Sequence, residues 1–211
     1  MLISCSEGGV VEDPAGVAHV HPQRLARYHR LTAAWPPTSL LQDTVKSRLP
    51  FGRRALDLGC GSGRDSQFLA RSGFSVTAID IASEAAAYFT KMDSVEFLQA
   101  DIEQLSLPTA AYDVVNAAFC LPFLRAAVVP RVIRHIKAAL RPRGVFVGHL
   151  FGDRYVGIGR NSSLALFTRA ELTAFFSTMN MLRLVEVERE GVLADGTAAH
   201  WHRFDIAAQH V

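Results

Sequence analysis

The chain has 211 residues, 49% of them hydrophobic and 20% charged, with 22 Lys and Arg against 20 Asp and Glu. This composition excludes a disordered chain, and the length suits one α/β domain. The near-balanced charge of +2 gives no strong attraction for nucleic acid or an anionic membrane, so neither is expected as a partner. Cys5, Cys60 and Cys120 form no CxxC pair, which favours a reducing, cytoplasmic compartment.

Two stretches of the sequence bear on export and membrane insertion. Residues 1–20 carry acids where a signal peptide has basic residues followed by an apolar run. The most apolar stretch, 110–129, is interrupted by Asp113, Asn116 and Arg125, whereas a transmembrane helix needs about 20 apolar residues in a row. We therefore expect a soluble protein without a membrane span.

The N-terminal quarter of the chain is predicted to be an arm followed by helices. Residues 1–20 show neither helical nor strand periodicity. Between residues 21 and 49, apolar residues recur at helical spacing on both sides of a WPP break, which predicts two helices. Tyr28 and Trp35 are candidates for an aromatic lid, with ordinary packing as the alternative. Residues 1–52 are therefore expected to form an arm and a helical lid.

Residues 53–211 alternate strand-like and helix-like segments. Parallel neighbouring strands need a crossover, which is usually helical, so the alternation predicts a doubly wound α/β sheet with helices on both faces. Ligands of such sheets bind at the carboxyl ends of the strands. The last two strands flank a DG turn and are expected to pair as an antiparallel hairpin. The expected strands are 55–58, 75–80, 95–99, 112–119, 145–151, 181–190 and 200–208, and the expected helices begin near Arg64, Ser83, Val128 and Thr168.

The stretch ALDLGCGSGRDSQFLARSGFSVTAID carries the strongest functional pattern. An apolar strand ends at Leu58, and Gly59, Gly61 and Gly63 follow before a helix begins near Arg64. Glycines adopt unusual backbone angles and leave no Cβ in the way of a ligand. The pattern predicts a loop that binds a nucleotide-type ligand.

Two acids follow the next two strands of the predicted sheet. Asp80 closes SVTAID, where its two oxygens can accept hydrogen bonds from both hydroxyls of a ribose. Asp101 follows the third strand in the same way, and a helix cap or turn is the alternative role for both acids. A dinucleotide site of the NAD type is disfavoured, because the GxGxxG fingerprint requires glycine or alanine where this chain has Arg64.

LDLGCGSGRD, Asp80 and the AD pair ending at Asp101 closely resemble the class I S-adenosylmethionine-dependent methyltransferases, over roughly Arg53 to the C-terminus. The resemblance implies a Rossmann-like sheet of seven strands whose last strand is antiparallel, with S-adenosylmethionine as cofactor. The segments GCGSGRDSQFLARSGFSV, FCLPFL, ALRPRG and HWHRF further resemble small bacterial methyltransferases of the tellurite-resistance type. Members of that group differ in acceptor, so this likeness does not name the substrate.

The resemblance to class I methyltransferases also implies which residues surround the cofactor. The glycine loop lines the methionine end, with one acid near the amino group and Arg64 at the carboxylate. Residues after the second and third strands bind the ribose and the adenine, and residues after the fourth strand flank the methyl group. The implied set is Asp57, Gly59, Cys60, Gly61, Gly63 and Arg64 for the methionine end, Asp80 for the ribose, Ile81, Asp101 and Ile102 for the adenine, and Ala118 and Phe119 beside the methyl group.

Two histidines are the candidates for catalysis. In the class I fold the last strand begins at the active-site end, which places His200 there, and His202 shares its face of the strand. Either could act as a base, with packing of the strand entrance as the alternative. HxH supplies only two ligands, so no metal site is expected. Cys60 and Cys120 are expected to be small buried residues rather than nucleophiles.

These features together predict a methyltransferase that transfers a methyl group to a small-molecule acceptor by in-line displacement. The predicted single domain has neither an insertion that could grip a macromolecule nor a dense basic patch. A non-catalytic S-adenosylmethionine-binding sensor is the alternative. We expect a monomer or a weak homodimer.

Overall fold

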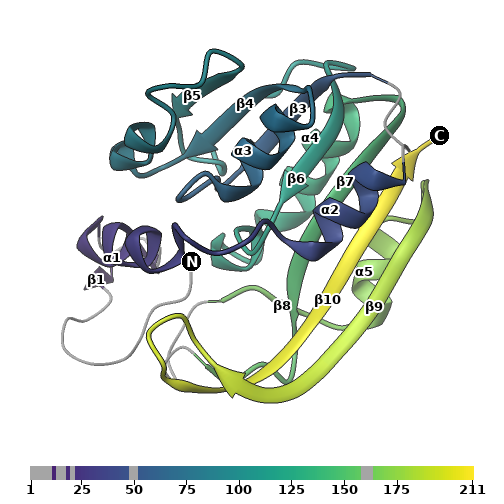
Figure 1. Cartoon of the computed structure of the whole chain (residues 1–211). Coiled ribbons are helices and arrows are strands. Elements are labelled where there is room, and N and C mark those ends of the chain that lie inside the picture. The colour runs from purple at the N-terminus through teal and green to yellow at the C-terminus, as the bar shows by residue number, and fades with distance from the viewer. Residues whose placement is uncertain (1–10, 13–17, 20–21, 48–51, 158–163) are drawn as a thin grey trace.

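The computed structural model describes residues 11–12, 18–19, 22–47, 52–157 and 164–211 (Figure 1). The short strands β1 (Val11–Glu12) and β2 (Ala18–His19) pair antiparallel within the segment expected to be an arm. The rest of that segment, with Cys5, lies outside the described residues. The two helices predicted on either side of the WPP break are present as α1 (Pro22–Thr32) and α2 (Ser39–Lys46).

A single large sheet forms the centre of the molecule, with strand order β5-β4-β3-β6-β7-β10-β9 (Figure 1). The first five strands in this order are parallel, and β10 runs antiparallel to both of its neighbours. This confirms the predicted Rossmann-like sheet of seven strands with the last one antiparallel. The strands are β3 (Arg54–Leu58), β4 (Ser75–Asp80), β5 (Val95–Gln99), β6 (Tyr112–Ala117), β7 (Leu140–Gly152), β9 (Met179–Val192) and β10 (Ala198–His210), and a short β8 (Leu166–Phe167) pairs with β7.

Helices cover both faces of the sheet (Figure 1). On one face, α2 and α3 (Arg64–Arg71) bury Leu41 and Leu69 against Val114 of β6. On the other face, α4 (Val129–Ala139) and α5 (Arg169–Phe175) pack against Val115. Successive residues of a strand point to opposite faces, so one central strand serves both cores. The second helix of the expected lid segment, α2, therefore contributes to the hydrophobic core of the domain.

Several local features differ from the sequence prediction. The helix expected from Ser83 is a 3₁₀ helix, η1 (Ser83–Tyr88), and a second one, η2 (Leu121–Phe123), follows β6. The strand expected to reach residue 119 ends at Ala117, because Phe119 adopts a left-handed φ of 57° that a strand cannot contain. The strand expected from residue 145 begins earlier, since β7 starts at the end of α4.

The chain reverses direction where turn chemistry predicted it. Gly73 follows α3 with a φ of 88°, and Gly196 has the same φ in the turn between β9 and β10. Thr168 caps α5 by accepting a hydrogen bond from the backbone N of Glu171, whose side chain bonds back to the cap. These short-range features depend on neighbouring residues alone, which explains why the sequence predicted them.

Gly59→Ala is expected to destabilise the fold by about 2–4 kcal/mol. The residue has a φ of 65°, which costs an L-residue about 1–2 kcal/mol, and its new Cβ would overlap the Cβ of Cys120. Gly73→Ala is the matched control, because it has the same kind of φ but nothing within 4 Å of an added Cβ. Urea unfolding of both variants measures the difference, and equal losses would contradict the packing argument.

Candidate cofactor and acceptor site

The glycine loop lies between β3 and α3, at the carboxyl edge where the strand order reverses between β3 and β6. Gly59 and Gly61 have φ values of 65° and 52°. The backbone N of Cys60 donates to the carbonyl of Ile79 on β4 at 2.9 Å, which ties the loop to the neighbouring strand. The loop backbone is therefore held in a conformation that only glycine adopts at low cost.

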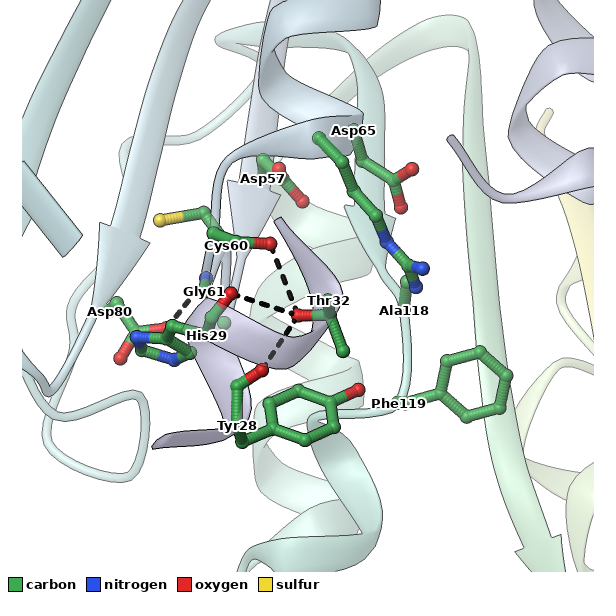
Figure 2. Close-up of a pocket in the computed structure, with 13 residues that line it drawn as sticks. Tyr28, His29, Thr32, Asp57, Cys60, Gly61, Asp65, Asp80, Ala118 and Phe119 are labelled. Carbon is green, nitrogen blue, oxygen red and sulfur yellow. Dashed lines mark hydrogen bonds between the residues drawn. The ribbon is translucent and has the colours of Figure 1, made fainter. Parts of the chain in front are cut away.

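A pocket lies beside this loop (Figure 2), with about 450 Å³ of empty space when the open solvent at its mouth is included. Eight of the twelve predicted cofactor residues line it: Asp57, Gly59, Cys60, Gly61, Arg64, Asp80, Ala118 and Phe119. Tyr28, a candidate for the aromatic lid, also lines it, and so do four residues that the sequence analysis did not assign to the site: His29, Thr32, Ser62 and Asp65.

Four predicted cofactor residues do not line this pocket. Gly63 approaches the side chain of Phe89, where an added Cβ would lie 2.6 Å from a ring carbon. Ile81 follows β4 and is 44% exposed, and Asp101 follows β5, where its Oδ1 accepts a hydrogen bond from a backbone N two residues on. Ile102 is buried beside a smaller, separate pocket. The role of Gly63 at the methionine end and the roles of the other three residues toward adenine stay predictions.

Asp80 lies at the end of β4 with 1% of its surface exposed. Its Oδ2 accepts a hydrogen bond from the backbone N of Gly61 at 2.8 Å, and its Oδ1 accepts one from the backbone N of Ala82 at 2.9 Å. Each carboxylate oxygen accepts two hydrogen bonds, so both retain capacity for a ligand hydroxyl. The turn role and the ligand role, alternatives in the sequence, are therefore compatible in the structure.

A pair of buried carboxylates lies under the loop, formed by Asp57 and Asp65. The side-chain amide of Asn116 donates to both, at 2.8 Å to Asp57 and 3.2 Å to Asp65. The hydroxyl of Ser66 donates to Asp57 at 2.5 Å. Burial, and next the charge of Asp65, raise the pKa of Asp57 to about 7. A cationic ligand group would favour the ionised pair.

The stability of the ligand-free protein is expected to fall between about pH 4 and 7 through this pair. The folded state keeps a proton on Asp57 up to about pH 7, whereas the unfolded chain releases it near pH 4. Asp57→Asn removes this penalty, so its melting temperature relative to the wild type should rise as the pH increases from 4 to 7. Thermal unfolding across that range checks the trend, and a pH-independent difference would contradict it.

The end of α1 and the segment that follows it are tied by hydrogen bonds to the glycine loop and to α3. The hydroxyls of Thr32 and Ser62 form a hydrogen bond of 3.2 Å. Thr38 donates to Asp65 twice, from its backbone N at 2.7 Å and from its hydroxyl at 3.0 Å. The guanidinium of Arg64 lies 5.7 Å from the ring centroid of Trp35. These contacts tie the segment to the loop and to α3, and of the two candidate lid residues Tyr28 lines the pocket whereas Trp35 is not among its lining residues. Closure as a lid stays a prediction.

An aromatic cluster adjoins the other end of the pocket, at Phe119. Its ring stacks on the imidazole of His149 with centroids 4.2 Å apart, and Trp201 contacts it edge-on at 6.4 Å. The guanidinium of Arg203 lies 5.9 Å from the same ring. Phe151 and Tyr155 belong to the same cluster, against which Tyr28 also packs. Strands distant in sequence bring these residues together, so no local pattern marked the partners of Phe119.

The structure does not bring His200 or His202 to the pocket. Trp201 and Arg203 point toward Phe119, so the alternation of β10 directs both histidines to the opposite face. There His202 is fully buried, accepts a hydrogen bond from the backbone N of Arg154 at 3.0 Å, and bonds Glu186 at 2.9 Å. His200 pairs with two other glutamates of β9. This arrangement favours the packing alternative.

The cysteines and the possible metal ligands have no reactive arrangement. Cys60 and Cys120 are buried free thiols, and burial raises the pKa of each well above its usual value, so neither is a thiolate. Among the residues that the structure describes, no group of three His, Cys, Asp or Glu side chains is placed to hold a metal ion. No helix in that part of the chain is long and apolar enough to cross a membrane.

Comparison with known proteins agrees with this geometry. A family model described as a methyltransferase domain matches residues 55–144. The chain is 33% identical over 171 residues to a ubiquinone biosynthesis O-methyltransferase from Marinobacter nauticus, an alignment covering 71% of this chain and 67% of that relative. The fold, the glycine loop and these matches define a class I methyltransferase domain. The chain belongs to the class I S-adenosylmethionine-dependent methyltransferase family.

Other matches cover a smaller part of the chain or have a lower sequence identity. A malonyl-[acyl-carrier protein] O-methyltransferase from Pectobacterium atrosepticum is 30% identical over 103 residues, which cover 48% of this chain and 40% of that relative. The chain spans less than half the length of several curated relatives that it matches. The crystal structure of TehB from Haemophilus influenzae has a TM-score of 0.69 at 20% identity, over 88% of this chain and 67% of that chain. That likeness concerns the fold.

Proposed function

We propose that the protein transfers the methyl group of S-adenosylmethionine to a small-molecule acceptor by in-line displacement. The observation that carries this proposal is a single pocket with the glycine loop and Asp80 on one side and Phe119 on the other. A nucleoside and an amino acid group fit the polar side, and an acceptor approaches from the aromatic side. Membership of the methyltransferase family supports the same reaction class.

The residues of the pocket fit this cofactor. Asp80 keeps free acceptor capacity for ribose hydroxyls, and the missing Cβ of Gly61 lets the ring of His29 lie close to the loop. The Asp57–Asp65 pair offers negative charge to an ammonium group, and Arg64 offers positive charge to a carboxylate. The predicted adenine contacts, Ile81, Asp101 and Ile102, follow the neighbouring strands.

The chain's own contribution to the reaction is positioning and exclusion of water. When bound, S-adenosylmethionine supplies an electrophilic methyl group on sulfur. Tyr28 and Phe119 present aromatic walls that hold an acceptor against the pocket and keep water away. Holding reactants in line is worth an effective molarity of about 10⁵–10⁸ M, without proton transfer by the protein.

The acceptors to be tested first depend on whether the attacking group needs a general base from the protein. An anionic thiolate or oxyanion attacks without one, whereas a neutral hydroxyl or an amine needs its proton removed. His200 and His202, the bases proposed from the sequence, lie outside the pocket lining. Anionic acceptors are therefore the first to test. The experiment incubates the protein with S-adenosylmethionine and thiols, selenite, tellurite or phenols, and measures S-adenosylhomocysteine. Acceptor-dependent product that is lost in Asp80→Asn supports the proposal.

A non-catalytic S-adenosylmethionine-binding protein is the alternative function. Tight cofactor binding without product for any acceptor would favour it, because the pocket would then be used for sensing alone. Calorimetry with NAD tests the dinucleotide site that Arg64 disfavours, and tight NAD binding with no response to S-adenosylmethionine would overturn our proposal. The cytoplasmic location and the monomeric or weakly dimeric state stay predictions.

A further inference from the structure

His29 is a buried polar side chain of the pocket to which the function proposed so far gives no role. It belongs to α1, is 1% exposed and lines the pocket (Figure 2). An added Cβ on Gly61 would lie 3.3 and 3.4 Å from two atoms of its ring, so the imidazole lies directly over the glycine loop. Figure 2 shows the ring beside Asp80, the predicted ribose ligand.

Two buried polar atoms without hydrogen-bond partners in the described part of the chain belong to His29 and to the nearby Glu84. Nδ1 of His29 is buried and has no hydrogen-bond partner among the described residues, and the same holds for Oε1 of Glu84. Leaving such a group unpaired costs about 1–3 kcal/mol. Burial lowers the pKa of His29, and the nearby charges of Asp80 and Glu84 oppose this effect. A neutral imidazole both donates and accepts hydrogen bonds, as does a hydroxyl.

The position of the ring is fixed by the attachment of α1 to the loop. Thr32, one helical turn after His29, bonds the hydroxyl of Ser62 and the carbonyl of Tyr28. Thr38, in the segment after α1, donates two hydrogen bonds to Asp65. The imidazole is therefore presented to the pocket by a tethered helix, and a ligand at Asp80 lies within its reach.

We propose that His29 binds the ribose of the cofactor together with Asp80, so that the hydroxyls contact a carboxylate from β4 and an imidazole from α1. This inference rests on the proposed function. It makes α1 part of the cofactor site, so that cofactor binding stabilises the covering helix. The partner missing from Nδ1 is then a ribose hydroxyl, which explains why a polar ring is buried there.

Binding of S-adenosylhomocysteine, measured by calorimetry, tests the inference without turnover. His29→Phe keeps an aromatic ring but removes its polar atoms, and should weaken binding about five- to tenfold. His29→Gln keeps a donor and an acceptor and should retain most of the affinity. Arg30→Ala, an exposed change on the same helix, is the matched control and should bind as the wild type does.

The ribose assignment is tested with S-adenosylhomocysteine analogues that lack the 2′ or the 3′ hydroxyl. For the analogue without the contacted hydroxyl, wild type and His29→Phe should bind equally. Unchanged binding of S-adenosylhomocysteine by His29→Phe would overturn the inference. Tighter binding would also overturn it, because the histidine would then obstruct the site. Hydrogen exchange of α1 in each variant reports whether ligand protects the helix, which also shows that the variants are folded.

The outcomes separate this inference from the proposed function. If the wild type fails to bind S-adenosylhomocysteine, both fail. If the wild type binds and Asp80→Asn weakens binding while His29→Phe and His29→Gln do not, only the role of His29 is refuted.

Discussion

Asp80→Asn is expected to weaken S-adenosylhomocysteine binding by about 2–3 kcal/mol, roughly 30- to 150-fold. The variant removes the charge that accepts ribose hydroxyls in our proposal. It also gives the side chain an NH₂ group where both oxygens now accept hydrogen bonds, from the backbone N of Gly61 and of Ala82. Loss of the ligand contact and distortion of the loop act in the same direction, which makes this one of the largest effects we predict.

Calorimetry at a fixed pH and salt concentration measures this loss. Asp93→Asn is the control, because Asp93 is exposed and its substitution removes the same formal charge. Thermal unfolding of Asp80→Asn separates a local change from loss of the fold. Wild-type affinity in the variant would refute both the ribose assignment and the pocket as the cofactor site.

His202→Ala is expected to lower stability by about 2–3 kcal/mol and the melting temperature by about 4–12 °C. The ring is fully buried, and its removal leaves a cavity beside Gly152. The backbone N of Arg154 loses its acceptor, and Glu186 loses one of its partners. Turnover per folded molecule should change little, because the ring lies on the sheet face away from Phe119.

His200→Ala is the companion variant on the same face of β10. His200 is partly exposed and pairs with Glu188 and Glu190 at the surface, so its loss should hardly change the melting temperature. The decisive comparison is turnover at a temperature where both variants are folded. Abolished turnover with wild-type stability in His202→Ala would restore the catalytic assignment made from the sequence.

Prediction from sequence succeeded where the relevant contacts are local. The glycine loop was predicted because three alternate glycines between a strand and a helix allow unusual backbone angles, and the structure has positive φ values at Gly59, Gly61 and Gly63. Asp80 was predicted because strand length alone places it at the carboxyl edge. The candidate histidines, His200 and His202, were placed from strand alternation without knowing which face of the strand lies beside the pocket. In the structure, Trp201 and Arg203 on the other face lie beside Phe119.

The sequence by itself determined the order of strands and helices and the glycine loop, because these depend on short-range periodicity and on backbone angles. The family was indicated by the resemblance of the motifs around that loop. Only the tertiary structure decided what else surrounds the pocket. His29 and Tyr28 arrive from α1, and Asp65 pairs with Asp57 through Asn116 of another strand. Such contacts join residues tens of positions apart, and their geometry follows from the packing of helices on the sheet, which no local pattern in the chain encodes.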